Sequence, residues 1–182
     1  GSAILLKISS DLVVKSHQKN TLNRGYFSFM PAKFFNNKQI RYHRYMFKKY
    51  VLKKLQKYVV KYFTMHPEVK LVVVAGSVGK TSTKRALGDL LVQRCRVRIH
   101  EGNFNSEVSV PLGILGIALP TKLKNPFSWF GVFRAARRRI NQPTDVDVIV
   151  QELGTDRPGD IAAFGAYLRP DLALITAVTP EH

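Results

Sequence analysis

Residues 71–83 read Leu71-Val-Val-Val-Ala-Gly-Ser-Val-Gly-Lys-Thr-Ser-Thr83, and this stretch decides the fold. The apolar run at residues 71–75 predicts a buried parallel strand. The run breaks at residues 76–79, and a helical pattern follows Lys80-Thr81. A strand, a glycine-containing loop, Lys-Thr and a helix in this order are typical of a phosphate-binding loop.

The residue types in this loop suit phosphate chemistry. Glycines let the backbone turn its N–H groups toward one point, and the start of a helix adds further N–H groups and a positive dipole end. Lys80 can reach terminal phosphates, and the Thr81 hydroxyl can ligate Mg²⁺. The spacing is the shorter G-x-x-G-K-T, because Val74 stands where the longer consensus has glycine, so a glycine turn with an incidental lysine is the alternative. We expect nucleotide phosphates to bind Gly76, Ser77, Val78, Gly79, Lys80, Thr81 and Ser82.

Composition limits the class of protein. A chain of 182 residues has room for one core and an appendage, and a hydrophobic content of 45% is typical of globular chains. No apolar run approaches the roughly 18 residues that span a bilayer, and no secretory signal is visible. Cys95 is the one cysteine, which excludes a disulfide framework and a cysteine-based zinc site. These features favour a cytoplasmic protein.

The positive charge is unevenly distributed. The formal net charge is +17, which predicts an anionic partner or surface. Residues 1–66 carry fourteen Lys and Arg against one acid, whereas residues 67–182 carry fifteen against eleven. We therefore predict two parts, a basic N-terminal segment at 1–66 and a domain at 67–182 that contains the phosphate loop.

An amphipathic helix is predicted at residues 41–63. One face carries Phe47, Val51, Leu55, Tyr58, Val59 and Tyr62, and a second row carries Lys49, Lys53, Lys57 and Lys61. Three interpretations remain open: the apolar stripe packs on the following domain, the helix lies on an anionic membrane, or it binds nucleic acid non-specifically. The sequence contains no motif for reading a groove or a base.

From residue 69 onward, strands alternate with helices. The pattern predicts strands at 70–75, 96–100, 145–152 and 172–178, and helices at 80–93, 112–119, 127–141 and 160–168. This order indicates an α/β fold with a P-loop-type parallel sheet and helices on both faces, preceded by the basic helical segment. Upstream, residues 3–14 fit a helix or a strand, and residues 20–37 are expected to be irregular.

Polar residues follow each predicted strand, where ligands bind in such folds. Asn103 and Asn105 follow the second strand, Glu152 ends the third and His182 follows the fourth. A carboxylate such as Glu152 next to a phosphate loop can hold Mg²⁺. From the residues alone, His182 fits a loop histidine, and the two asparagines fit Asx turns or helix caps equally well.

Four segments together resemble one family. They begin at Gly76, Gly102, Glu152 and Pro170 and read GSVGKTST, GNFNSEVSVP, ELGTDRPGDI and PDLALITAVTPEH. In this order, over residues 68–182, they are similar to the central ATPase domain of the Mur ligases, most closely of the MurF type. The resemblance implies ATP-dependent formation of an acyl phosphate on a UDP-sugar-peptide carboxylate, which an amine such as D-Ala-D-Ala then attacks to give an amide of a peptidoglycan precursor.

The resemblance also implies roles for single residues. Lys80 and Glu152 are expected to be catalytic, Thr81, Glu152 and His182 to bind Mg²⁺, and Asn103, Asn105 and Ser106 to contact the UDP-sugar-peptide. Ser77 and Ser106 depart mildly from the family pattern, and the family's later segments do not occur in the chain, so we expect a fragment that binds phosphate or nucleotide weakly at best and cannot complete ligation alone. The competing hypothesis is a P-loop NTPase or kinase with a basic membrane- or nucleic-acid-binding arm.

Overall fold

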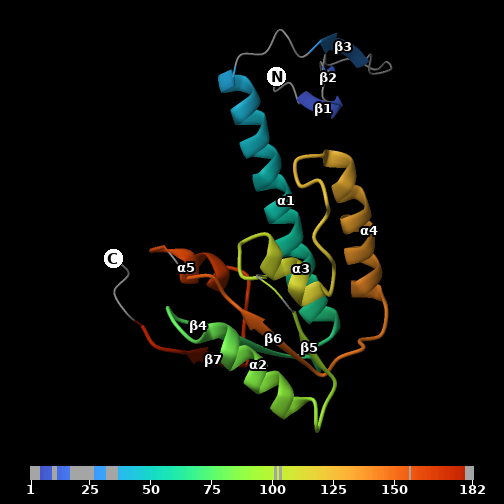
Figure 1. Cartoon of the computed structure of the whole chain (residues 1–182). Coiled ribbons are helices and arrows are strands. Elements are labelled where there is room, and N and C mark those ends of the chain that lie inside the picture. Colours follow the sequence, from blue (N-terminus) through green and yellow to red (C-terminus); the bar gives the residue numbers. More distant parts are fainter. Residues whose placement is uncertain are drawn as a thin grey trace. The chain divides into compact units, whose positions relative to one another are not determined.

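The structure is a computed structural model (Figure 1). It describes the backbone of residues 5–9, 12–16, 27–31, 37–100, 102, 104–155 and 157–178, and, within these ranges, side chains at residue 39 and from residue 41 onward. The chain divides into two compact units. One comprises Gly1–Val51 with Pro120–Gly131, and the other comprises Leu52–Leu119 with Val132–His182. The domain boundary drawn from charge, between residues 66 and 67, stays a prediction.

The first unit contains a small antiparallel sheet. Strands β1 (Leu5–Ser9), β2 (Leu12–Ser16) and β3 (Phe27–Pro31) lie in the order β1-β2-β3, and Val14 pairs with Phe29. The ambiguous pattern at residues 3–14 is thus two strands. The irregular structure expected at residues 20–37 is wrong at β3, where aromatic residues at alternating positions favour strand pairing.

Helix α1 (Asn37–Met65) is longer than the predicted helix at 41–63. The predicted stripe residues Val51, Leu55, Val59 and Tyr62 are all buried. In the second unit Val59 and Tyr62 belong to the main core, and the Tyr62 hydroxyl lies 3.3 Å from the Thr144 hydroxyl. These contacts confirm the packing interpretation for the apolar stripe, while the lysine row at 49, 53, 57 and 61 stays exposed.

The second unit is organised around a four-stranded parallel sheet, which confirms the predicted fold class. The strands are β4 (Lys70–Ala75), β5 (Val97–Ile99), β6 (Val148–Glu152) and β7 (Leu172–Ile175), in the order β5-β6-β4-β7. All three strand pairs are parallel. The register pairs Val74 with Glu152 and Ala75 with Ile175, so β4, β6 and β7 end at the same edge.

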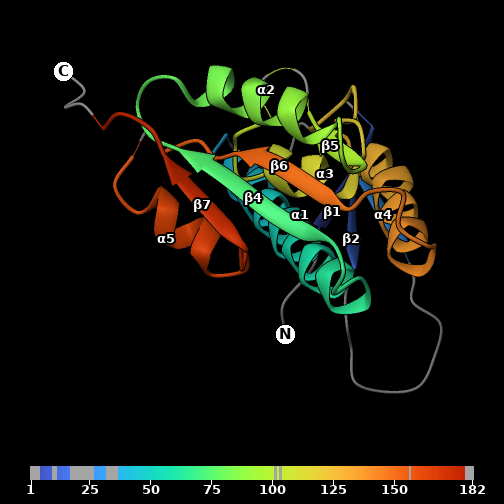
Figure 2. The same cartoon turned by 90° about the horizontal axis from the view of Figure 1, so that it is seen from below.

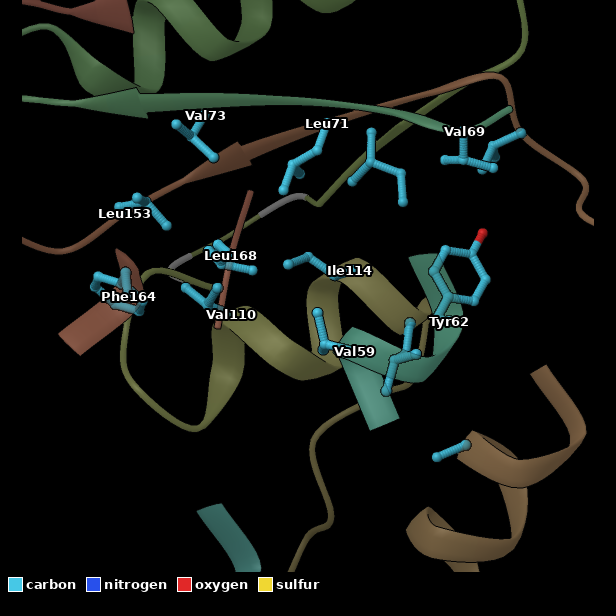
Figure 3. Close-up of a cluster of buried hydrophobic side chains, with 14 of the residues drawn as sticks. Val59, Tyr62, Val69, Leu71, Val73, Val110, Ile114, Leu153, Phe164 and Leu168 are labelled. Carbon is cyan, nitrogen blue, oxygen red and sulfur yellow. The ribbon is translucent and has the colours of Figure 1, made fainter. Parts of the chain in front are cut away.

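Helices cover both faces of this sheet (Figure 2). Because successive strand residues point to opposite faces, Leu71 and Val73 join one core and Val72 and Val74 the other. The larger core receives side chains from α1, α3 (Ser109–Leu115), α4 (Pro126–Asn141) and α5 (Asp160–Gly165). Figure 3 shows this cluster, with Tyr62 and Val59 beside Ile114. Leu87 and Leu91 of α2 (Lys80–Leu91) cover the smaller core.

The predicted helix at 112–119 is displaced. Helix α3 begins at Ser109, because a proline such as Pro111 is tolerated in the first turn, where its missing N–H has no intrahelical partner. The helix ends at Leu115, where the N–H of Gly116 donates to the Gly113 carbonyl and that of Ile117 to the Leu112 carbonyl. The prolines on either side of the apolar run therefore do not mark the two ends of this helix.

Other elements are also shorter than their patterns, among them β6, α5 and β7. Strand β6 starts at Val148 and not at 145, because the Arg96 carbonyl accepts the N–H groups of both Asp147 and Val148 before the ladder begins. Helix α5 ends at Gly165 and β7 at Ile175, three residues before the predicted ends. Among the described residues, no helix has the length and apolarity needed to cross a bilayer.

Substituting Gly88 tests the contact between α2 and β5. A Cβ atom at this position would lie 1.6 Å from Cδ1 of Ile99, so Gly88→Ala forces this side chain to move. We expect a loss of roughly 1–3 kcal/mol in the free energy of unfolding, measured by urea denaturation. In an Ile99→Ala background the same substitution should cost nothing, since alanine favours helix. An equal cost in both backgrounds would show that the clash is not the cause.

Candidate functional site

The loop between β4 and α2 is held by residues far along the chain. Gly76 has φ 131°, and a Cβ atom there would lie 2.2 Å from Oγ1 of Thr176, so only glycine fits. The Ser77 N–H donates to the Ala177 carbonyl at 2.9 Å, and the Thr155 hydroxyl donates to the Gly76 carbonyl at 3.1 Å. The loop conformation thus depends on the segments after β6 and β7.

Lys80 lies over this loop. It is the first residue of α2, and its ammonium donates to the Gly76 carbonyl at 2.5 Å and the Ser77 carbonyl at 3.2 Å. The N-cap residue Gly79 provides no side-chain cap for the helix. The predicted loop residues therefore gather around the start of α2, where backbone N–H groups can meet an anion.

Glu152 comes from the end of β6 and meets two side chains of α2. The Thr81 hydroxyl donates to Oε2 of Glu152 at 2.9 Å, and Nζ of Lys84 lies 3.3 Å from the same oxygen. The side chains of Lys84 and Glu152 are 4% and 9% exposed, so this is a buried ion pair. The structure brings together Thr81 and Glu152, the two residues for which sequence predicted a shared metal.

These two residues fit a magnesium ion by their chemistry. A hydroxyl and a carboxylate are hard oxygen donors, the kind that Mg²⁺ prefers. Both lie beside the loop that Lys80 spans. The third predicted ligand, His182, lies outside the described residues.

The segment after β5 borders the same edge of the sheet. The Asn105 carbonyl accepts the Gly154 N–H at 2.7 Å, which ties this segment to the turn after β6. The hydroxyls of Ser106 and Ser109 lie 2.8 Å apart, and the Ser106 hydroxyl oxygen accepts the Ser109 N–H at 3.3 Å at the start of α3. Asn103 lies outside the described residues. The binding and metal roles assigned from sequence to all these residues remain predictions.

Sequence reasoning missed two residues of this site, Lys84 and Thr155. Lys84 lies three residues after Thr81 on α2, a spacing that places both side chains on one helix face. That spacing, read together with the acid at the end of β6, was a usable signal for the Lys84–Glu152 pair. Thr155 gave no such signal, because its contact with Gly76 depends on the turn after β6.

His100 lies at the end of β5 against the start of the next loop. Its ring stacks on Phe104, with centroids 4.4 Å apart and planes at 22°. Its Nε2 atom is buried and, among the described residues, has no hydrogen-bond partner. Burial lowers the pKa of His100, the charges of Arg98 and Lys84 lower it further, and a hydrogen bond with the Gly113 backbone opposes the shift.

This environment predicts a pH dependence of stability. The pKa of His100 is depressed in the folded state, so the unfolded chain binds more protons as pH falls through its ordinary value of about 6.5. We expect the free energy of unfolding to fall as pH drops below about 6.5. Urea titrations at pH 8 and pH 5.5 measure this loss, and His100→Gln should reduce it. If the variant keeps the full pH dependence, other groups cause it.

Comparisons of the sequence with known proteins point to one family. Residues 74–182 match the model of the Mur ligase middle domain. The chain is 27% identical over 115 residues to the UDP-N-acetylmuramoyl-tripeptide–D-alanyl-D-alanine ligase of Rickettsia prowazekii, a match that covers 63% of this chain and 20% of that one. The Bacillus subtilis ligase of the same name is 26% identical over 113 residues, 62% of this chain and 19% of its own length.

One solved structure is also similar. It is the UDP-N-acetylmuramoylalanyl-D-glutamyl-2,6-diaminopimelate–D-alanyl-D-alanyl ligase from Acinetobacter baumannii, with a TM-score of 0.48 and 22% identity, covering 66% of this chain and 22% of that one. The chain spans about a fifth of the length of the curated relatives it matches. The family model itself covers more than half of the 182 residues. The chain belongs to the Mur ligase family.

Proposed function

We propose that this chain is the phosphate-holding part of an ATP-dependent carboxylate–amine ligase of peptidoglycan precursor synthesis. The whole protein then joins D-Ala-D-Ala or another amine to a UDP-MurNAc-peptide. The observation that carries the proposal is the Thr81–Glu152 hydrogen bond of 2.9 Å beside the loop that Lys80 spans. Membership of the Mur ligase family supports the same proposal, in which these residues bind ATP together with Mg²⁺.

Each residue has a separate task in this proposal. The loop from Gly76 to Ser82 holds the nucleotide phosphates through backbone N–H groups at the start of α2. Lys80 moves its ammonium from the loop carbonyls to the terminal phosphate and neutralises its charge. Thr81 and Glu152 hold Mg²⁺, which when bound screens the phosphate charge from the incoming carboxylate. His182 is proposed to hold a second Mg²⁺.

The substrate side of the site is proposed to involve Asn103, Asn105 and Ser106. Asn105 is anchored through its carbonyl to Gly154, next to the strand that ends in Glu152. Side-chain amides and hydroxyls at this edge suit a polar sugar-peptide ligand, because they both donate and accept hydrogen bonds. The polar segment is therefore within reach of the edge at which phosphoryl transfer is proposed.

We also propose a cytoplasmic location with peripheral membrane contact through residues 41–63. The exposed lysine row of α1 supports contact with anionic lipid, and Tyr42, Tyr45 and Tyr50 are exposed beside basic residues. Co-sedimentation of the chain with anionic and neutral vesicles at low and high salt tests this part. Equal recovery with both vesicle types would refute it, whatever the result for the nucleotide site.

Calorimetric titration tests the nucleotide site. ATP and ADP with Mg²⁺ should bind, and AMP should bind far more weakly, because the proposed contacts are to the outer phosphates. A chain that binds AMP as tightly as ATP would use a different part of the nucleotide. A chain that binds none of the three would leave the proposed function without its nucleotide site.

A further inference from the structure

Two lysines on adjacent turns of α2 do different things. Nζ of Lys80 donates to the loop carbonyls of Gly76 and Ser77. Nζ of Lys84 lies in the interior, 3.3 Å from Oε2 of Glu152. Lys80 is part of the proposed phosphate site, whereas no role follows for Lys84 from the phosphate chemistry.

Lys84 and the proposed metal would both interact with the same carboxylate oxygen of Glu152. Oε2 of Glu152 accepts the Thr81 hydroxyl and lies beside the Lys84 ammonium. A buried carboxylate needs a nearby positive charge, and Lys84 supplies it without any metal. A divalent cation that binds Glu152 therefore meets a carboxylate whose charge is already neutralised. The cation also comes within a few ångströms of the Lys84 ammonium, which carries a like charge.

The nucleotide changes this balance. Its phosphates bring several negative charges to the loop beside Thr81, and these outweigh the single ammonium. The metal is then attracted by phosphate and carboxylate together, although Lys84 stays in place. The same ammonium thus weakens metal binding to the free protein far more than binding to the nucleotide complex.

We propose that Lys84 is a positioning residue that neutralises Glu152 and thereby makes divalent-metal binding dependent on bound nucleotide. The inference rests on the proposed function in one respect, that Thr81 and Glu152 are the metal ligands. Its direct consequence concerns the nucleotide-free chain, in which Lys84 keeps the metal site weak.

Titration of the full chain with Mn²⁺, without nucleotide and followed by electron paramagnetic resonance, tests this role. We expect Lys84→Met to bind Mn²⁺ at least about tenfold more tightly than the original chain. Lys84→Arg retains the charge and should stay weak. Adding Glu152→Gln to Lys84→Met should abolish the gain. Unchanged affinity in Lys84→Met, or a gain that survives Glu152→Gln, would overturn the proposal.

Two further measurements keep the outcomes separate. Circular dichroism checks that each variant is folded, and Lys84→Gln, which can still donate to Glu152, replaces Lys84→Met if the latter is not. A second titration with ATP present judges the proposed function, with Mn²⁺ and ATP without protein as the reference because ATP itself binds Mn²⁺: no difference between the original chain and this reference refutes the nucleotide site. The nucleotide-free comparison between Lys84 variants still decides the role of Lys84.

Discussion

Lys80→Ala should weaken binding of ATP with Mg²⁺ by about 10- to 150-fold, the equivalent of one hydrogen bond to a charged group. The ammonium of Lys80 lies within reach of the loop carbonyls of Gly76 and Ser77, where terminal phosphates are proposed to bind. Calorimetry on the original chain and the variant measures the difference.

The matched control for this loss is Arg85→Ala. Arg85 lies on the same helix, is exposed and carries the same charge. Its removal should change the affinity by less than about threefold, since exposed charges are screened by salt. If both variants lose affinity equally, general positive charge attracts the nucleotide and Lys80 has no special role. The melting temperature of each variant must be compared as well, because Lys80 also holds the loop.

Glu152→Ala should destabilise the chain by about 3–5 kcal/mol, the largest effect on stability that we expect. The substitution removes the partner of Lys84, whose side chain is only 4% exposed, and leaves an ammonium buried without its counter-charge. The Thr81 hydroxyl loses its acceptor at the same time. Urea denaturation without nucleotide or metal measures the change in the free energy of unfolding.

An exposed ion pair provides the control. Arg96 pairs with Asp147, but their side chains are 59% and 43% exposed, so Arg96→Ala should cost far less stability than Glu152→Ala. Replacing both buried partners, with Lys84→Met and Glu152→Leu, should recover most of the loss, because no unpaired charge remains. If Glu152→Ala lowers the free energy of unfolding no more than Arg96→Ala does, the Lys84 ammonium must reach solvent in the variant.

The fold of residues 67–182 was predictable because its central strands, β4 and β6, contain long apolar runs. Such runs identify parallel strands buried on both faces. The glycine loop after Ala75 marked the end of one such strand, and the alternation of strands and helices along the chain could be predicted from that point. Element ends were less predictable, as Pro111 shows. Proline is allowed in the first turn of a helix but does not require a helix there, so the residue type alone did not show where α3 begins.

The site was only partly predictable. Glu152 stood out at a strand end and Thr81 in the loop motif before α2, and the parallel register of β4 with β6 brings them into contact. Lys84 did not stand out, because a lysine on a helix is usually exposed and its burial depends on the position of Glu152. The β1–β3 sheet was only partly predictable, because residues 3–14 fitted a helix or a strand and five-residue strands leave a weak local signal.

The bond from the Ser77 N–H to the Ala177 carbonyl has a consequence for synthesis of the protein. The phosphate loop is short and local, yet its conformation depends on a residue one hundred positions later. On the ribosome, the loop remains incomplete until the segment after β7 has emerged. The proposed nucleotide therefore cannot nucleate folding of the nascent chain from the loop. It can bind only chains whose parallel sheet is already assembled, and such nonlocal assembly is slow.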